Sequence, residues 1–311
     1  MTIHEQLGVQ TLGITPRKAR RRDDQQLWRW LTFGPALGMM VVLSILPLAN
    51  LFLSSFQDIA WVNGTAVRTA AGLRHYAALP SDELFRAGLS NTFLFAFGAV
   101  AGQMVLGFML ALLCSEVTRG RVLYRAIFIL PILIPGIVIG AIWKLMLNFD
   151  FGLVNKSLSL FGLMPHDWLG TPETALLSVI AVDIWHWTPF CFLLFLAGLE
   201  SLPQDVFEAT KMDGASPWQE LRYVTLPLMV PTIIVTFAFR LVLAFKVFDE
   251  VYLLTSGGPG TSTEVVSFTL YQRFFTEDRI GYGSAMSVAV IFIVSLMLVV
   301  ALATRRSGAS S

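Results

Sequence analysis

The longest stretches without a charged residue decide what this chain can fold into. Residues 30–57, 87–115 and 280–304 contain no Asp, Glu, Lys or Arg, and they run for 28, 29 and 25 residues. A helix needs about 20 apolar residues to cross the hydrocarbon core of a bilayer. Helices buried in soluble proteins are usually shorter than these runs. The three segments therefore predict membrane-spanning helices and exclude the core of a soluble domain.

Three further apolar stretches raise the predicted number of spans to six. They cover residues 126–143, 174–199 and 223–247, of which the last two contain a few embedded charges. The composition agrees, since 55% of the residues are hydrophobic and only 14% are charged, against about 25% charged in soluble domains. The chain is therefore predicted to be an all-α membrane protein with six transmembrane helices.

Basic residues predict how these spans are oriented. They precede the first span (Arg17, Lys18, Arg20, Arg21, Arg22, Arg29), follow the second (Arg119, Arg121, Arg125) and follow the last (Arg305, Arg306). Because Lys and Arg accumulate in cytoplasmic segments, we expect both termini in the cytoplasm, which an even number of spans also requires. The predicted division is a basic cytoplasmic tail over 1–29, the six-span domain over 30–303 and a short cytoplasmic tail over 304–311.

Several kinds of chemistry lack the residues that they require. A net charge of +1 gives no strong attraction to nucleic acid. The histidines at 4, 75, 166 and 186 are too scattered for a metal site. No G-x-x-x-x-G-K-[ST] pattern occurs, so the chain has no phosphate-binding loop for ATP. Cys114 and Cys191 both fall within predicted spans. We expect no enzymatic activity, no metal and no cofactor in this chain.

The loop between the fourth and fifth spans, residues 200–225, is polar. The spacing of a helix-capping box occurs twice in it, at Ser201–Gln204 and at Ser216–Gln219. Gly214 lies between the two, where a turn favours positive φ. The loop therefore predicts two short helices joined by a glycine turn. It carries five acidic and two basic side chains, a net charge of −3, which fits either a docking surface for a basic partner or a solvated connector.

This loop also resembles a known motif. The segment EATKMDGASPWQELRYVTLPLMVP, residues 208–231, is similar to the EAA motif of ABC-importer permeases, with Thr210 at the position of the second alanine. DIWHWTPFCFLLFLAGLESLP (183–203) and FDEVYLLTSGGPGTSTE (248–264) resemble two other segments of permeases that import sugars, polyols and glycerol phosphates. The resemblance extends over about residues 30–303.

The resemblance implies a fold and a function. The expected fold is that of ABC type I importer permeases. The chain is then the permease subunit of an ATP-driven importer for a sugar, polyol or glycerol-phosphate-type solute, working by alternating access in the inner membrane of a bacterium. In this family the EAA loop inserts into a cleft of the ATPase subunit. The residues that it places at this contact are Glu208, Ala209, Asp213, Gly214, Ala215 and Ser216.

The resemblance also names the partners. They are a second, homologous permease that completes a heterodimer, two ABC ATPase subunits that bind the ATP and Mg²⁺, and an external solute-binding protein. The carbohydrate substrate and the lipid bilayer complete the set, and no nucleic acid is expected.

Charged side chains within spans mark the candidate substrate path, because each one is costly to bury in a bilayer. Asp183 and Arg240 lie in spans four and five, roughly 5 Å on the outer side of the midplane. There they either pair with each other or face a wet cavity. Trp187 offers an aromatic face to a sugar ring, although Trp also accumulates at membrane interfaces.

Spans three to five are the predicted core of this path, because helices that are interrupted within the membrane often line transport sites. The residues predicted to interrupt them are Pro131, Pro135 and Gly136 in span three, Pro189 in span four, and Pro227 and Pro231 in span five.

The alternative is an ion-coupled secondary transporter for a small polar solute. It would need intramembrane carboxylates to carry the ion, and the sequence predicts only Asp183 in such a position. A subunit of a membrane oxidoreductase would need paired His or clustered Cys ligands, and His186 stands alone in the predicted spans. The importer permease therefore remains the predicted function.

Overall fold

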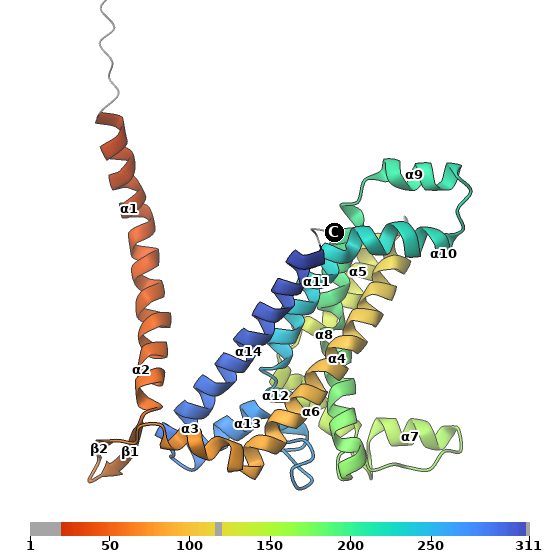
Figure 1. The fold of residues 1–311 in the computed structure, drawn as a ribbon. Helices are drawn as coiled ribbons and strands as arrows, with labels where there is room; N and C mark the ends of the chain where they lie inside the picture. Colours follow the sequence, from red (N-terminus) through yellow and green to blue (C-terminus); the bar gives the residue numbers. More distant parts are fainter. Residues whose placement is uncertain (1–19, 116–119, 309–311) are drawn as a thin grey trace, which may run out of the picture. The chain divides into compact units, whose positions relative to one another are not determined.

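The computed structural model describes residues 20–115 and 120–308. They divide into two units, the first of which ends at Leu53 and the second of which begins at Ser54. In the first unit, α1 (Arg20–Met40), a π-helical turn (Val41–Ile45) and α2 (Leu46–Ser54) follow one another as a single rod (Figure 1). From residue 28 to 53 no side chain of this rod is buried. The rod forms the first membrane span, Trp28–Ser54.

Parts of the two predicted tails and of one predicted loop lie outside the described residues. These are residues 1–19, which include Arg17 and Lys18, residues 116–119, which include Arg119, and residues 309–311.

The second unit begins with a β-hairpin that the prediction of an all-α protein did not include. Strands β1 (Gln57–Val62) and β2 (Thr65–Ala70) pair in antiparallel register, with Val62 opposite Thr65. The turn between them is Asn63–Gly64, and both residues have positive φ. Asn-Gly is the preferred pair for such a two-residue turn. The Asn-Gly pair is a sequence signal for a hairpin, and a prediction made from apolar runs alone did not include it.

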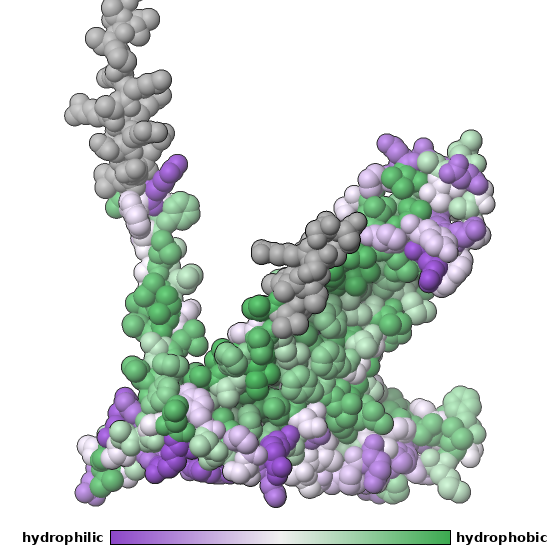
Figure 2. All heavy atoms as spheres, viewed as in Figure 1, coloured by the Kyte–Doolittle hydropathy of each residue, from purple (hydrophilic) through white to green (hydrophobic). Residues whose placement is uncertain are grey.

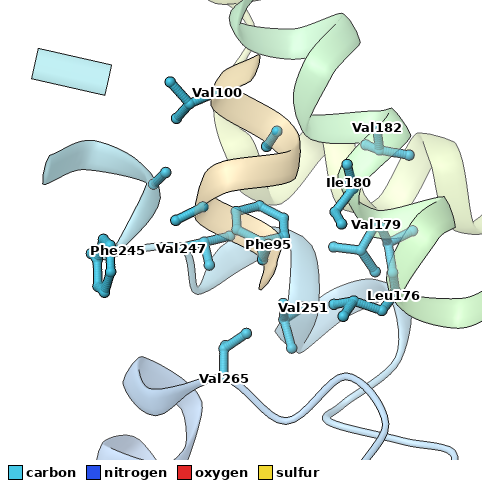
Figure 3. Packing of buried hydrophobic residues seen from close by; sticks show 14 of the residues in the cluster. Phe95, Val100, Leu176, Val179, Ile180, Val182, Phe245, Val247, Val251 and Val265 are labelled. Carbon is cyan, nitrogen blue, oxygen red and sulfur yellow. The ribbon is translucent and has the colours of Figure 1, made fainter. Parts of the chain in front are cut away.

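Two long helices, α4 (Glu83–Ser115) and α8 (Pro172–Glu200), pack along each other and form the centre of the second unit. Figure 3 shows the buried side chains that α4 and α8 contribute to this core, together with those from the segments after span five. The labelled residues are Phe95, Val100, Leu176, Val179, Ile180, Val182, Phe245, Val247, Val251 and Val265. Lipid tails are as apolar as the side chains of a membrane helix, so the hydrophobic effect does not drive helices together within a bilayer. Close packing of side chains is therefore a main source of helix association there.

Span three is broken in the middle, as predicted. Its first half, α5 (Arg121–Ile129), passes through a 3₁₀ turn (Leu130–Leu133) into its second half, α6 (Gly136–Met146), and the two halves are bent by 92°. Pro131 and Pro135 both lie at this bend. Each removes a backbone N–H and crowds the preceding turn, which is the usual cause of a sharp kink.

Spans four and five are not broken, so the prediction for their prolines was wrong. Pro189 lies inside α8, which continues for 29 residues. Pro227 and Pro231 lie inside α11 (Leu226–Ala244), which continues directly from a π-helical turn at Leu221–Thr225. A π-helical turn is wider than an α-helical one, so the turn before Pro227 leaves room for its ring. Neighbouring helices stabilise such prolines in membrane spans.

The remaining elements lie at the two ends of the helical bundle or form the last span. They are α3 (Arg74–Ala78), a 3₁₀ turn (Leu79–Ser81), α7 (Leu153–Leu160), α9 (Gln204–Met212), α10 (Pro217–Glu220), α12 (Asp249–Leu254), α13 (Val266–Tyr271), a π-helical turn (Gln272–Thr276) and α14 (Ile280–Gly308).

A polar clamp holds three segments of the chain together at the end of the bundle opposite α9 and α10. The Asp82 carboxylate accepts hydrogen bonds from Tyr282 Oη at 2.8 Å and from Arg273 Nη2 at 3.2 Å. Burial by itself raises the pKa of Asp82. The hydrogen bonds from Tyr282 and from the Phe85 backbone, with the Arg273 charge, lower that pKa below its ordinary value. The clamp joins the start of α4, the turn before α14 and α14 itself.

Among the described residues, five helices are long and apolar enough to cross a membrane, and the bent pair α5–α6 provides the sixth span. Figure 2 shows that the surface of the second unit is mostly apolar along the bundle, with hydrophilic residues at α9 and α10 and around α3. This distribution fits a protein that crosses a bilayer and is wetted at both ends.

The orientation of the spans predicts which ends react with an impermeant thiol reagent. Met164 lies in the loop between spans three and four and Met212 in the loop between spans four and five, and their side chains are 89% and 87% exposed. The two native cysteines are buried. In intact cells an impermeant maleimide should label Met164→Cys and not Met212→Cys, and inverted vesicles should give the opposite pattern. Labelling of both from one side would contradict the six-span topology.

Candidate substrate cavity and coupling loop

Two short helices extend from the end of α8, as the sequence predicts. Figure 1 shows α9 and α10 at the end of the bundle where α8 finishes and α11 begins. The turn between α9 and α10 contains Gly214 with φ of 73°, which is the left-handed region that glycine adopts freely. A Cβ placed on Gly214 meets nothing within 4 Å, so the backbone conformation is what requires glycine here.

One of the two predicted capping boxes is formed. At the start of α10 the Gln219 amide donates to Ser216 Oγ at 3.4 Å, and the Ser216 amide donates to Gln219 Oε1 at 2.8 Å. The box predicted at Ser201–Gln204 is absent, because Ser201 still belongs to the end of α8. Both its amide and its hydroxyl donate to Gly198 O, which leaves Pro203 as the residue before α9.

The surface of this loop is exposed and acidic. No residue of α9 or α10 is buried. Glu208 and Asp213 are both exposed, and so are the apolar Met212 and Trp218. The base of the loop is tied to the first half of span three by an ion pair between Arg125 and Glu200. The loop is therefore held at its base while its far surface remains accessible. Its contact with an ATPase stays a prediction.

Asp183 and Arg240 form the direct pair that the sequence analysis considered. Arg240 Nη2 lies 3.2 Å from Asp183 Oδ2, and their side chains are 1% and 3% exposed. Gln103, which the sequence analysis missed, completes the contact from α4. Its Nε2 donates to Asp183 Oδ2 at 2.7 Å, and its Oε1 accepts from Arg240 Nε at 2.7 Å. Three helices, α4, α8 and α11, therefore meet at one buried polar cluster.

A second buried pair lies beside the first. His186 Nδ1 is 3.0 Å from Glu250 Oε1, and their side chains are 5% and 7% exposed. Glu250 is therefore a second buried carboxylate of the path beside Asp183, which was not predicted. Glu250 was missed because span five was taken to end at residue 247. The short helix α12 folds Glu250 back against α8 instead of carrying it out of the protein.

These side chains line one cavity of about 230 Å³. Asp183, Trp187 and Arg240, the three residues predicted for the substrate path, are all part of its wall. The full set of lining residues is Gly136, Asp183, His186, Trp187, Arg240, Leu243, Lys246, Val247, Phe248, Asp249 and Glu250. The structure thus brings the predicted residues together, and their contact with a substrate stays a prediction.

Trp187 is held by the same cluster. The guanidinium carbon of Arg240 lies 4.5 Å from the centre of the indole ring, which is a cation–π distance. His186 and Phe190 contact the indole from other sides. The face of Trp187 that Arg240 covers is therefore not free for a sugar ring. Trp187 instead helps to fix the orientation of Arg240.

Helices α6 and α12 approach each other closely at the wall of this cavity. A Cβ on Gly136 would lie 2.9 Å from Asp249 Oδ2, and a Cβ on Gly140 would lie 2.8 Å from Leu253 Cβ. The two glycines are four residues apart, and such small-residue spacing lets membrane helices pack at short distance. The second half of span three is thereby joined to the helix that carries Glu250.

The described residues contain no group of three or more His, Cys, Asp or Glu side chains that could hold a metal ion. Cys114 and Cys191 are buried and do not form a disulfide.

Comparisons with known proteins give a consistent result. Residues 103–308 match the family model described as "Binding-protein-dependent transport system inner membrane component". The chain is 36% identical over 278 residues to the trehalose/maltose transport system permease protein MalF of Thermococcus litoralis, with 89% of this chain and 93% of the relative covered. It is 31% identical over 289 residues to the sulfoquinovosyl glycerol transport system permease protein SmoG of Agrobacterium fabrum, with 89% and 93% covered.

Among solved structures, a bacterial ABC transporter involved in the import of the acidic polysaccharide alginate is similar to this chain. The TM-score is 0.80, with 24% sequence identity, and the match covers 92% of this chain and 99% of the other. At this identity the similarity shows that the fold is shared.

The pair of Asp183 and Arg240 predicts a specific pattern of mutant stability. Asp183→Asn or Arg240→Gln alone leaves one buried charge unpaired, and breaking such a pair from one side costs about 3–5 kcal/mol. The double variant removes both charges and should be more stable than either single variant. The melting temperature of the purified permease in detergent measures this, with the exposed Asp205→Asn as a control. Additive effects of the two substitutions would show that the two side chains are not coupled.

Proposed function

Because this chain belongs to the family of binding-protein-dependent transport system inner membrane components, we propose that its cavity conducts a carbohydrate across the membrane. The chain is the permease subunit of an ABC importer, and the ATPase of such an importer is a separate subunit. Several of its relatives are named as sugar permeases. The observation that carries the proposal is the polar cavity lined by residues of spans three, four and five and of α12.

The proposed mechanism is alternating access. The ATPase subunits bind ATP with Mg²⁺, so this chain itself needs no cofactor. Closure of the ATPase dimer would move α9 and α10, and the movement would pass into α8, which ends at this loop, and into α11, which follows it. Six residues are proposed to contact the ATPase: Glu208, Ala209, Asp213, Gly214, Ala215 and Ser216. Their exposure supports this role, since all of them are exposed or half-buried.

The proposed assembly contains more than this chain. It pairs with a second, homologous permease as a heterodimer, binds two ATPase subunits on the cytoplasmic side and receives its solute from an external solute-binding protein. Its place is the inner membrane of a bacterium, with both termini in the cytoplasm. The proposed division of the chain is a basic tail (1–29), a six-span domain (30–303) and a short tail (304–311).

Reconstitution separates this function from an ion-coupled transporter. The complete complex in proteoliposomes, supplied with its binding protein, should take up labelled carbohydrate only when ATP is present on the ATPase side. Dissipating the proton and sodium gradients should leave uptake unchanged. Both buried carboxylates of the path are paired, Asp183 with Arg240 and Glu250 with His186, and an ion carrier would have to give up such a pair. Uptake that follows an ion gradient without ATP would refute the proposal.

The coupling loop predicts variants that insert normally but do not transport. Gly214→Asp forces a side chain into left-handed backbone, at a cost of about 1–2 kcal/mol, and adds bulk at the exposed turn. Glu208→Arg reverses the charge of an exposed residue expected to face a basic group of the ATPase. Both variants should pair with the sister permease. ATP-driven uptake and substrate-stimulated ATP hydrolysis should fall together, and less ATPase should co-purify.

The control for these variants is Thr210→Ala, which restores the second alanine of the EAA pattern and should leave transport unchanged. Normal transport by Gly214→Asp, with the ATPase still bound, would show that the loop is only a connector.

A further inference from the structure

We propose that this cavity selects uncharged carbohydrates and rejects those that carry a phosphate, sulfonate or carboxylate. The inference rests on the proposed function, since it concerns the solute that the same cavity conducts. The relatives do not decide the question, because one is named for trehalose and maltose and another for sulfoquinovosyl glycerol, a sulfonated solute. The inference rests instead on the charges that this chain contributes to the cavity wall.

The wall of the cavity carries no excess of positive charge. Its carboxylates are Asp183, Asp249 and Glu250, and its permanent cations are Arg240 and Lys246. Three negative and two positive charges sum to −1 when His186 is neutral, and to zero when it is protonated. An anionic solute would therefore meet a neutral or negative wall, in a protein interior where charge interactions are poorly screened.

The buried cation of the wall is already paired with a carboxylate of the same wall. The Arg240 guanidinium contacts Asp183 Oδ2 at 3.2 Å and Gln103 Oε1 at 2.7 Å, and it lies over Trp187. Sites that bind phosphate or carboxylate through arginine present a free pair of N–H donors. If Arg240 turned to a solute anion, Asp183 would be left charged, buried and without its cation, which is strongly unfavourable.

The other cation is placed differently. Lys246 is exposed, so its ammonium group stays well hydrated. The exposed Asp249 follows three residues later on the same wall and brings the opposite charge. These two residues together add no net charge to the cavity.

The hydrogen-bonding character of the wall also favours hydroxyl groups. An ionised carboxylate accepts hydrogen bonds at about four sites, and the contacts that Glu250 and Asp183 make with His186, Gln103 and Arg240 use only some of these sites. Sugar hydroxyls can donate to the acceptors that are left. A phosphate dianion or a sulfonate has no proton to donate, so it would face carboxylate oxygens that repel it.

Equilibrium binding of matched probes tests the inference. The complete complex of both permeases and the ATPase subunits is placed in lipid nanodiscs without the binding protein, so that only the membrane cavity is measured. The radiolabelled probes are maltose, trehalose against trehalose 6-phosphate, and glycerol against glycerol 3-phosphate. We expect a neutral probe to bind at least about tenfold more tightly than its phosphorylated partner. A phosphorylated probe that binds as tightly as its neutral partner overturns the inference.

Two variants test the electrostatic cause. Asp183→Asn releases Arg240, and Asp249→Asn removes an exposed carboxylate without touching the buried pairs. Each should reduce the ratio of the binding affinities of the neutral and the phosphorylated probe. We expect a reduction of about tenfold for Asp183→Asn and a smaller one for Asp249→Asn. Glu173→Gln is the control, because it removes an exposed carboxylate from the first turn of the same helix α8, away from the cavity.

The outcomes separate this inference from the proposed function. If the affinity ratio stays unchanged in both cavity variants, the charge argument alone is overturned. If Asp183→Asn fails to assemble, an unchanged ratio in Asp249→Asn overturns it. Equal binding of neutral and phosphorylated probes leaves the carbohydrate cavity in place and removes only its selectivity. If no probe of either kind binds, the cavity does not hold carbohydrate, and both proposals fall.

Discussion

The contact of Asp183, Arg240 and Gln103 is the interaction on which the arrangement of the spans depends. Each of these side chains is buried at membrane depth, where water does not satisfy a polar group and an unpaired charge is costly. The three come from α8, α11 and α4, so each helix supplies what the other two lack. A shift of one helix along its axis by a single turn would separate the partners by about 5.4 Å. The cluster therefore fixes the relative height of three helices that apolar packing alone would hold less specifically.

The same cluster shows how far the sequence could predict the site. The depth of Asp183 and Arg240 in their spans follows from counting residues, and it was sufficient to predict that the two could pair. Gln103 has no such signal, because an uncharged amide in an apolar span is compatible with many positions. Glu250 was missed for a different reason. A sequence shows where an apolar run ends, but it does not show that the chain then folds back as α12 and returns a charged residue to the interior.

Some of the local elements could likewise be predicted from the sequence, and others could not. The glycine turn and the Ser216–Gln219 box were predictable, because the interactions lie within a few residues of each other. Ser201 has the same spacing to Gln204, yet α8 continues far enough to use it. A proline within an apolar span also does not predict by itself whether the helix is broken. Two of them bend span three by 92°, while a π-helical turn or buried packing keeps α8 and α11 continuous. The packing of neighbouring helices decides between these outcomes, and the local sequence does not predict that packing.

The close contact between α6 and α12 limits how the cavity can open. With Gly136 facing Asp249 and Gly140 facing Leu253, the two helices have no room for a side chain at either point. Shear between the two helices would press side chains into these two contacts, whereas a movement of α6 and α12 as one body keeps the contacts between them. We therefore expect the wall formed by α6 and α12 to move as one body when the cavity opens, and such a movement would have to break or carry along the contact of Glu250 with His186.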